Sequence, residues 1–506
     1  MSVKYVGSID QGTTSTRFIL FDHAGTPCFS FQKEHKQIYP KPGWVEHNPI
    51  EILENTVECI RETLKQASIE DSKEEIAAVG ITNQRETVIA WNRETGKPYA
   101  NAVVWQDLRG EDFINETLAS GGKYRFLEKT GLMLSPYFSG SKIKWLLDNV
   151  SGLREEAEAG RVLFGTIDTW ILWNMTGGPR GGLSVTDVTN ACRTFLMDLT
   201  SLSWDDELLN LFGCPKKSLP EIVSSIPEVP YGYSSADSPF GEGVPFSGIL
   251  GDQQAALFGQ TCFKPGMSKS TYGTGGFLLM NVGKHIVYSD SGLLTTVAYR
   301  KGNEKPVYAL EGSVAVAGSL IQWVRDNLGL IRTSKEIDKL AAEVEDNGGV
   351  YFVPAFAGLF APYWRSRARG VICGLTGYAD RRHIARAVLE ATAFQTFDIF
   401  QAMSRDADIR IPELKVDGGM TNSEPLMQFQ SDLLKIPVIR PVVTETTALG
   451  AAYAAGLSVG FWNSFDELIQ NWQIDKVWKP QMDAGRRLAL LADWKKALER
   501  SYGWID

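Results

Sequence analysis

The chain has 506 residues, of which 43% are hydrophobic, and this length predicts two to four folded domains. Its net charge is −9 at pH 7 and its pI is about 5.4, which argues against a nucleic-acid partner. Its six cysteines form no Cys-x-x-Cys pair, and its amino-terminal residues show no basic-then-apolar signal. We therefore expect a cytoplasmic protein without membrane insertion.

The first predicted elements are strands at residues 3–9 and 18–21, joined by a tight turn. Gly12 in this turn lets the backbone approach a ligand closely, and Arg17 offers a planar fork for phosphate. Asp10 could hold Mg²⁺, or its waters, beside a nucleotide. An ordinary strand–turn–strand is the alternative. Hydroxyl and amide donors follow Gly12 at Thr13, Thr14 and Ser15.

A third strand at residues 27–34 would extend this hairpin to an antiparallel meander, and residues 50–66 have the periodicity of a helix. Residues 75–81 lead into a predicted strand that ends at Asn83, and a charged pair, Arg85 and Glu86, follows it. On a polyol, one member of the pair could donate to hydroxyls and the other could accept from them. A solvated loop pair is the alternative.

Residues 248–254 predict an apolar strand that ends in Asp252 and Gln253. A carboxylate at the carboxyl end of a strand, beside glycines, is well placed to face a cleft. Asp252 could then accept a proton from an attacking hydroxyl. A turn aspartate is the alternative.

A second strand–turn–strand unit follows, with strands at residues 267–271 and 277–282 and a Gly/Thr turn at residues 272–276. We interpret it as a diverged repeat of the first hairpin. Two such halves would face each other across a cleft, with a boundary near residues 251–265.

Two further strands are predicted at residues 348–361 and 415–419. The second contains Val-Asp-Gly-Gly, whose backbone could lie against a flat adenine, or simply make a turn. Residues 447–457 predict a helix with small side chains on every face, which suits close backbone crossing or plain core packing.

The order of these features resembles the sugar-kinase, actin and Hsp70 ATPase superfamily. Residues 137–149, and residues 370–375 with 383–390, are similar to the two signatures of the carbohydrate-kinase family that carries FGGY-type repeats. Within this family the chain most resembles the members that act on glycerol, over residues 5–462. The segments that carry this likeness are residues 8–15, 42–47, 80–87, 165–170, 186–190, 251–254 and 310–312.

The resemblance implies a role for each matching residue, with Asp252 as the general base and Asp10 near the metal. Residues that would bind the glycerol hydroxyls are Arg85, Glu86, Tyr137, Asp252 and Gln253, and those at its carbon edge are Trp105 and Phe277. Residues that would bind the ATP phosphates are Thr13, Thr14, Ser15, Arg17 and Thr274. The nucleotide pocket would include Gly318, Gln322, Gly419 and Ser423, the last in place of the family's usual asparagine.

The resemblance also implies an α/β fold of the actin-like ATPase type, with two ribonuclease H-like domains at residues 1–255 and 256–506. Each would have a mixed five-stranded sheet flanked by helices, and ATP and substrate would bind in the cleft between them. The expected reaction transfers the γ-phosphoryl group of ATP to glycerol with Mg²⁺, in a homodimer or homotetramer. One alternative is a kinase of a larger acceptor such as xylulose or gluconate. Another is a nucleotide-driven switch, whose ATP hydrolysis would be indifferent to glycerol.

Bacterial members of this kind are often inhibited by fructose 1,6-bisphosphate, through a basic loop that shortly precedes the catalytic aspartate. Residues 218–263 of this chain contain no Lys, Arg or His. Since a bisphosphate needs cationic partners or clustered backbone donors, we expect an enzyme that is insensitive to this inhibitor.

Overall fold

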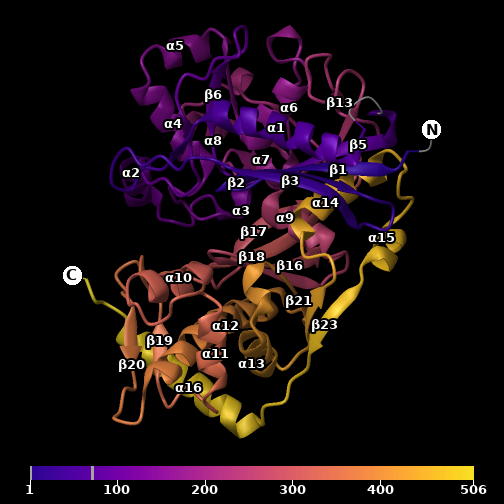
Figure 1. Ribbon diagram of the computed structural model, residues 1–506. Coiled ribbons are helices and arrows are strands. Elements are labelled where there is room, and N and C mark those ends of the chain that lie inside the picture. Colours follow the sequence, from indigo (N-terminus) through magenta and orange to yellow (C-terminus); the bar gives the residue numbers. More distant parts are fainter. Residues whose placement is uncertain (1–2, 70–72, 506) are drawn as a thin grey trace. The chain divides into compact units, whose positions relative to one another are not determined.

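The computed structural model describes residues 3–69 and 73–505 (Figure 1). The chain divides into two compact units, each made of three separate stretches. Unit 1 consists of Met1–Thr261, Thr295–Tyr308 and Thr446–Trp472. Unit 2 consists of Cys262–Leu294, Ala309–Glu445 and Gln473–Asp506.

Unit 1 contains a mixed six-stranded sheet in the order β13-β14-β5-β1-β2-β3. The first hairpin is confirmed, because β1 pairs antiparallel with β2, and β2 with β3. β1 also pairs parallel with β5, and β5 pairs parallel with β14. The strands are β1 (Tyr5–Gln11), β2 (Ser15–Phe21), β3 (Pro27–Glu34), β5 (Ile76–Asn83), β13 (Gly232–Tyr233) and β14 (Pro245–Gly251).

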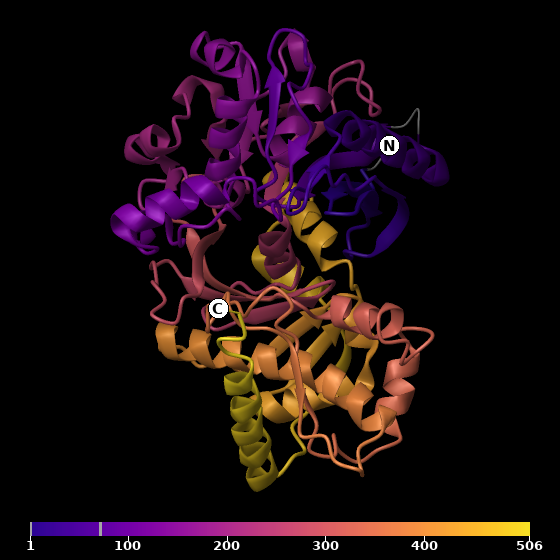
Figure 2. The same ribbon diagram turned by 90° about the vertical axis from the view of Figure 1, so that its left-hand side faces the viewer.

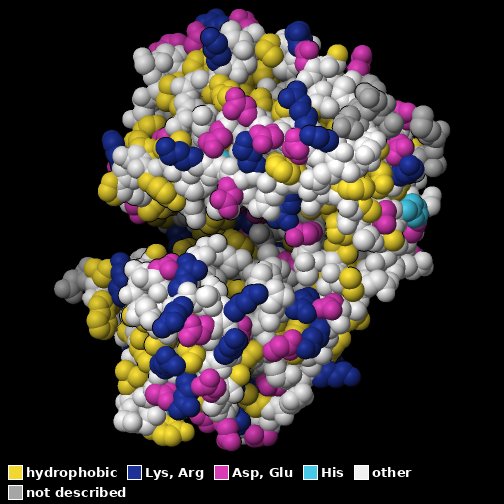
Figure 3. Space-filling view, in the orientation of Figure 1, with side chains coloured by type: hydrophobic (Ala, Val, Ile, Leu, Met, Phe, Trp, Pro, Cys, Tyr) yellow, Lys and Arg dark blue, Asp and Glu magenta, His cyan; other side chains and the backbone are white. Residues whose placement is uncertain are grey.

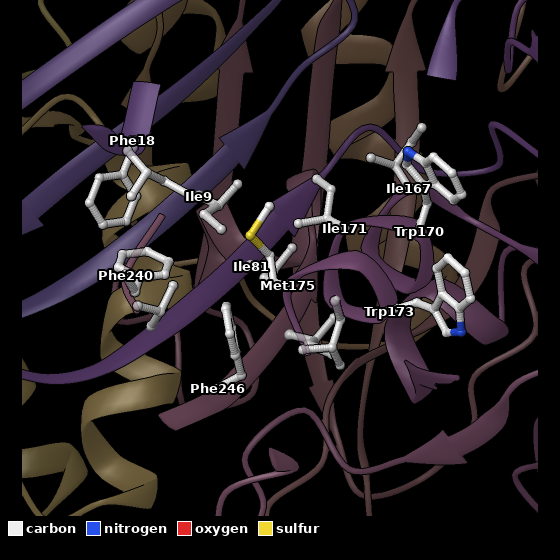
Figure 4. Close-up of a cluster of buried hydrophobic side chains, with 14 of the residues drawn as sticks. Ile9, Phe18, Ile81, Ile167, Trp170, Ile171, Trp173, Met175, Phe240 and Phe246 are labelled. Atoms are coloured by element: carbon white, nitrogen blue, oxygen red, sulfur yellow. The ribbon is translucent and has the colours of Figure 1, made fainter. Parts of the chain in front are cut away.

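Helix α1 (Pro49–Ala67) packs on β2 and β3, and Asn48 caps its amino-terminus by accepting from Ile50 N. Together with α6 (Ile167–Met175), it closes a core in which Phe18, Trp170 and Phe246 are buried (Figure 4). This burial of large apolar side chains is the main stabilising term of the unit.

The other face of the same sheet is covered by α14 (Thr446–Ser458), which packs on α9 (Asp252–Gly259) and on β1, β5 and β14. The backbones approach so closely that a Cβ atom on Gly80 would lie 2.2 Å from the Ala451 carbonyl oxygen, and one on Gly450 would lie 1.9 Å from that of Ala255. The predicted close crossing by this small-residue helix is therefore confirmed.

The second sheet has seven strands in the order β17-β18-β16-β15-β21-β22-β23. β15 pairs antiparallel with β16 and parallel with β21, as β1 does with β2 and β5. The second hairpin is thus a structural repeat of the first. The strands are β15 (Ser268–Tyr272), β16 (Gly276–Gly283), β17 (Leu294–Tyr299), β18 (Val307–Val314), β21 (Leu414–Asp417), β22 (Val438–Pro441) and β23 (Ile474–Trp478).

The predicted two-domain α/β fold is confirmed, but the predicted strand number, five in each sheet, is wrong. Five strands of each sheet follow the repeated order, and additional strands extend the edges: β13 in the first sheet, β17 and β23 in the second. An added strand pairs the backbone groups that a sheet edge would otherwise expose.

In unit 2, α12 (Arg381–Ala407) begins with a capping box formed by Asp380 and His383. The carboxy-terminal helix α16 (Ala484–Arg500), yellow in Figure 2, packs on α12 through stacked rings of Phe394 and Trp494, 4.9 Å apart. Other helices of this unit are α10 (Gly318–Asp326), α11 (Glu336–Ala342) and α13 (Glu424–Leu434).

The long strand expected at residues 348–361 is wrong. Only β19 (Tyr351–Val353) forms there, paired with β20 (Val371–Cys373). Pro354, which lacks a backbone donor, follows β19 and ends the ladder. The strand expected at residues 415–419 ends at Asp417, because Gly418 adopts a φ of 89° and the short helix η4 (Gly419–Asn422) begins.

The other described helices and strands complete the two units. The helices are α2 (Glu111–Gly121), α3 (Leu127–Thr130), α4 (Ser139–Asn149), α5 (Leu153–Glu158), α7 (Val188–Ala191), α8 (Asp206–Phe212), α15 (Phe465–Asn471), η1 (Lys73–Glu75), η2 (Gly178–Arg180) and η3 (Lys216–Ser218). The strands are β4 (Glu46–His47), β6 (Ile89–Asn92), β7 (Ala102–Val103), β8 (Val162–Gly165), β9 (Val185–Asp187), β10 (Met197–Asp198), β11 (Ser203–Trp204) and β12 (Glu221–Val223).

Acidic and basic side chains are interspersed on the face seen in Figure 3. Among the described residues, every helix is too short or too polar to cross a membrane.

Candidate functional site

The candidate site of unit 1 lies where three parallel strands end. Asn83 at the end of β5 is opposite Gln11 of β1 and Gly251 of β14. The carboxyl ends of parallel strands form one edge of a sheet, where ligands bind in open α/β folds. Asp10, one position before the end of β1, and Asp252, the first residue after β14, therefore belong to the same edge.

Asp252 lies next to Arg85. It is the first residue of α9, and its Oδ1 accepts from its own neighbour Gln253 N at 2.7 Å and lies 3.1 Å from Arg85 Nε. The side chain of Asp252 is 28% exposed, whereas that of Arg85 is 2% exposed. The carboxylate is thus anchored on one side and accessible on the other.

Two successive side-chain hydrogen bonds fix the position of Arg85. Its Nη1 donates to Gln254 Oε1 at 3.0 Å, and Gln254 Nε2 donates to Thr296 Oγ1 at 2.9 Å. Gly251 leaves the space that Arg85 needs, since a Cβ atom there would lie 2.7 Å from Arg85 Cδ. The guanidinium is therefore held in one position by side chains of the protein itself.

Glu86 occupies a tight turn with a φ of 63°, and Thr87 N donates to Arg85 O across it at 2.7 Å. This i to i+2 hydrogen bond around a positive φ is rare and strained for a residue with a side chain, and such strain concentrates at functional sites. The Glu86 Oε1 atom lies 2.6 Å from Arg193 Nε and 4.0 Å from Arg85 Nε. Two buried guanidiniums therefore flank one buried carboxylate.

Two aromatic side chains connect this group to the first hairpin. The rings of Trp105 and Tyr137 meet edge to face, with centroids 5.5 Å apart. Trp105 Nε1 donates to Thr13 Oγ1 at 3.0 Å, and Trp105 N donates to Thr87 Oγ1 at 3.2 Å. Trp105 thus joins the Glu86 turn to the hydroxyl-rich hairpin turn.

The turn of the first hairpin is closed by Gly12 N, which donates to Ser15 O at 2.9 Å. Thr14 is exposed, and Thr13, Ser15 and Arg17 are half-buried. The hydroxyls and amides of this turn are a suitable surface for phosphate oxygens.

A buried polar network supports that turn. Gln37 Nε2 donates to Thr13 O at 3.0 Å, and its Oε1 lies 2.9 Å from His47 Nε2. Gln84 Nε2 donates to Gln11 Oε1 at 3.0 Å and lies 3.3 Å from His47 Nδ1. Burial lowers the pKa of His47 to about 3, so the imidazole stays neutral at physiological pH.

Lys142 is a buried lysine whose amine contacts the backbone around Tyr137. Its Nζ donates to the carbonyl oxygens of Pro136 at 2.6 Å, Tyr137 at 2.7 Å and Phe138 at 3.4 Å. Three acceptors match the three donors of an ammonium group, but burial lowers the pKa of this amine to about 7. Lys142 fixes the backbone of the loop that carries Tyr137.

Unit 2 has a corresponding group around its own hairpin turn. Ala317 N and Ser319 N donate to Thr274 O, at 3.1 and 3.0 Å, so the start of α10 is bound to the turn. A Cβ atom on Gly318 would lie 2.5 Å from Gly273 O, whereas one on Gly419 would meet no atom within 4 Å. The turn, α10 and η4 therefore meet with an open backbone surface at Gly419.

The other predicted residues of unit 2 are less closely grouped. Phe277 lies on β16, opposite Thr271 of β15. Gln322 is exposed on α10. Ser423 caps α13 by accepting from Leu426 N, and its hydroxyl donates to Asp338.

The donor set at the first sheet edge fits Mg²⁺. In nucleotide sites, Mg²⁺ uses one or two carboxylates and takes its other ligands from phosphate oxygens and water. Asp10 and Asp252 supply two carboxylates at one edge. Among the described residues there is no group of three or more His, Cys, Asp or Glu side chains that could hold a metal.

Sequence reasoning missed Arg193 and Lys142. Arg193 is a charged residue in the largely apolar segment Ala191–Leu196, and Lys142 lies in the first turn of α4, directly before the largely apolar Ile143–Leu147; both are buried. A buried charge must be paired, so this pattern was a usable signal of their involvement.

Two α/β units with equivalent sheets and hydroxyl-rich hairpins define the fold class of the sugar kinases and actin-like ATPases. The chain belongs to the FGGY family of carbohydrate kinases, whose N-terminal domain matches residues 5–259 and whose C-terminal domain matches residues 269–459.

Relatives and solved structures agree with this family. The chain is 58% identical to a glycerol kinase of Chloroflexus aurantiacus over 503 residues, covering 99% of this chain and 100% of that one. It is also 58% identical to a glycerol kinase of Clavibacter michiganensis over 506 residues, covering 100% and 99%. A Plasmodium falciparum glycerol kinase with ADP is 41% identical, with a TM-score of 0.92 over 99% of this chain and 98% of that one. A xylulose kinase of Lactobacillus acidophilus, 23% identical with a TM-score of 0.84 and 99% coverage of both chains, shares the fold.

Proposed function

We propose that this chain transfers the γ-phosphoryl group of ATP to glycerol and releases sn-glycerol 3-phosphate and ADP. The observation that carries the proposal is the group of Arg85, Glu86 and Asp252 at one sheet edge, which offers a donor, an acceptor and an accessible carboxylate. Full-length identity of 58% to proteins named glycerol kinase supports glycerol as the acceptor, and the ADP-bound relative supports ATP as the donor.

Asp252 is the proposed general base. Alcohols are much weaker acids than carboxylic acids, so Asp252 first orients the hydroxyl and accepts its proton late in the reaction. The hydroxyl oxygen forms the new bond to phosphorus, the bond from phosphorus to the ADP oxygen breaks, and the proton passes to Asp252 and then to water. Arg85, 3.1 Å from Asp252, keeps the carboxylate in one orientation.

The polyol is proposed to lie among polar groups on one side and aromatic rings on the other. Arg85 would donate to its hydroxyls and Glu86 would accept from them. Further hydroxyl contacts are assigned to Tyr137 and Gln253, and carbon-edge contacts to Trp105 and Phe277.

The phosphates are proposed to bind the hydroxyl-rich turns. Phosphoryl transfer requires an in-line hydroxyl and neutralisation of charge. Mg²⁺, when bound with the nucleotide near Asp10, would supply part of that neutralisation. Phosphate contacts are assigned to Thr13, Thr14, Ser15, Arg17 and Thr274, and nucleotide contacts to Gly318, Gln322, Gly419 and Ser423.

A coupled assay of ADP release, with and without glycerol, tests this function. We expect release to depend on glycerol and to be much slower with xylulose or gluconate at equal concentration. Comparable turnover with those acceptors would favour the kinase of a larger sugar. ATP hydrolysis that is indifferent to glycerol would favour a nucleotide-driven switch.

We also propose a cytoplasmic location, supported by the six free cysteines, and a homodimer or homotetramer, which light scattering would measure. The domain boundary between residues 255 and 256 stays a prediction.

A further inference from the structure

Arg193 is held in place by the segment that precedes it. The Asp187 side chain accepts from Thr189 N at 3.0 Å and from Asn190 N at 2.9 Å, and so caps α7. The side-chain amides of Asn190 and Asn83 exchange hydrogen bonds of 3.0 and 3.1 Å. Because Asn83 ends β5, these two hydrogen bonds tie α7 to the sheet edge. The backbone just before Arg193 is therefore held in place.

The Arg193 side chain contacts two of the predicted glycerol ligands. Its Nε donates to Glu86 Oε1 at 2.6 Å, with 0% and 2% of the two side chains exposed. Its guanidinium carbon lies 5.7 Å from the centroid of the Tyr137 ring and 5.3 Å from that of Phe138. One buried cation therefore contacts both the carboxylate and the aromatic ring.

Glu86 needs such a partner in order to act as an acceptor. A buried carboxylate without a close cation takes up a proton or turns away, and the protonated form loses acceptor capacity. Arg85 is 4.0 Å from the same oxygen and is already engaged with Asp252 and Gln254. Arg193 is the closer of the two cations to the Glu86 carboxylate, at 2.6 Å.

We infer that Arg193 is a positioning residue for acceptor binding, which keeps Glu86 ionised and oriented toward a substrate hydroxyl and holds the Tyr137 ring beside it. The inference deepens the proposed function and rests on it, because Glu86 matters in this way only if a polyol is the acceptor. Arg193 itself is not assigned a contact with the substrate.

The test compares Arg193→Lys and Arg193→Met with the full-length wild type. A lost hydrogen bond to a charged group corresponds to roughly a 10- to 100-fold change in binding. We expect Arg193→Met to raise the KM for glycerol by that factor while the KM for ATP stays within about twofold, since the ATP contacts are separate. Arg193→Lys keeps the charge without the planar fork and should recover part of the loss.

A double-mutant cycle separates positioning from a general structural role. If Arg193 acts through Glu86, Arg193→Met should add little to the glycerol KM of Glu86→Gln. This double variant also removes both charges together, so it leaves no unpaired buried charge and remains informative where Arg193→Met alone unfolds. Arg386→Met is the matched control, because it breaks the half-buried Arg386–Glu390 pair of α12 in unit 2 and should leave the glycerol KM unchanged.

An unchanged glycerol KM in Arg193→Met would overturn the inference. So would equal increases of both KM values, or a full additive effect in the Glu86→Gln background. A wild-type enzyme without glycerol-dependent ADP release would instead overturn the proposed function, and the two failures are therefore distinguishable.

Discussion

At the level of single residues, the accessible carboxylate of Asp252 leads us to predict how a substitution there changes turnover. Asp252→Asn keeps the shape and one acceptor oxygen but cannot take a proton, so turnover should fall by about 10²- to 10⁴-fold. Glycerol binding should be largely retained, because Arg85 and Glu86 remain in place. Steady-state kinetics and calorimetric titration with glycerol measure the two effects. Near-normal turnover would mean that another group is the base.

The neutral His47 makes stability depend on pH. Its pKa is about 3 in the folded chain and 6.5 ordinarily, so below pH 6.5 the unfolded state binds a proton that the folded state does not. This contribution to stability is therefore lost as the pH falls from 6.5 toward 3, and it amounts to about 2 kcal/mol by pH 5.

His47→Gln keeps hydrogen-bonding groups near Gln37 and Gln84 but cannot titrate. Between pH 7 and pH 5, its free energy of unfolding should therefore fall by less than that of the wild type, as measured by urea titration. The neighbouring His35 ring, whose centroid lies 4.5 Å away, is present in both proteins, and because burial lowers its pKa as well, the variant keeps part of the pH dependence. Identical pH dependences would show that His47 does not titrate as described.

At this scale, local sequence indicated some of the site but not its supports. Arg85 and Glu86 are adjacent in the chain, and Asp252 follows an apolar strand, so each stood out from its own segment. Arg193 lies 107 positions from Glu86. Such a pair depends on how α7 packs against the end of β5, which no local pattern encodes. The φ of 63° at Glu86 was equally hidden, since positive φ is expected at glycine.

Among the elements, α14 is the one whose composition matters most. A Cβ atom at Gly450 would lie 1.9 Å from Ala255 O in α9, so Gly450→Ala must push the two helices apart. Overpacking of this kind costs typically about 1–3 kcal/mol. Because Asp252 begins α9, kcat should fall as well. Gly377→Ala, where a Cβ meets no atom within 4 Å, is the control and should change neither the melting temperature nor kcat.

The elements that sequence predicted best are those with a strong period and clear end signals. The helix expected at residues 50–66 corresponds to α1 (Pro49–Ala67). Asn48 caps this helix, and a proline is its first residue. The strand expected at residues 348–361 failed because apolar content continues beyond β19 while Pro354 prevents pairing. The edge strands β13 and β23 are short or exposed, and their pairing is decided by the neighbouring strand rather than by their own pattern.

At the scale of the whole molecule, the distribution of charge predicts insensitivity to fructose 1,6-bisphosphate. Residues 218–263 lack Lys, Arg and His. Asp237 in this segment pairs with Arg180, so that cation already has a carboxylate partner. Glycerol-dependent ADP release should be unchanged by millimolar fructose 1,6-bisphosphate. Saturable inhibition would show that another surface binds the anion.

Unit 1 is made of separate stretches of the chain, and this predicts how fragments of the protein behave. A fragment that ends at Thr261 lacks Thr446–Trp472, which includes α14 and the buried Trp462. One face of β1, β5 and β14 would then be exposed, and we expect a protease-sensitive, poorly folded product. Co-expression with residues 446–472 should increase its resistance to limited proteolysis. Full resistance of the shorter fragment alone would contradict this expectation.

The same feature sets a limit on folding during synthesis. Between Gln11, the last residue of β1, and Trp472, the last residue of unit 1, the ribosome must add about 460 residues. At elongation rates of about 5–20 residues per second, that delay is roughly 23–92 s. Until α14 has been made, the apolar face of the first sheet that this helix covers stays exposed. We therefore expect the nascent chain to bind holding chaperones until α14 has been made, and we expect slower elongation to lengthen the period in which it can aggregate.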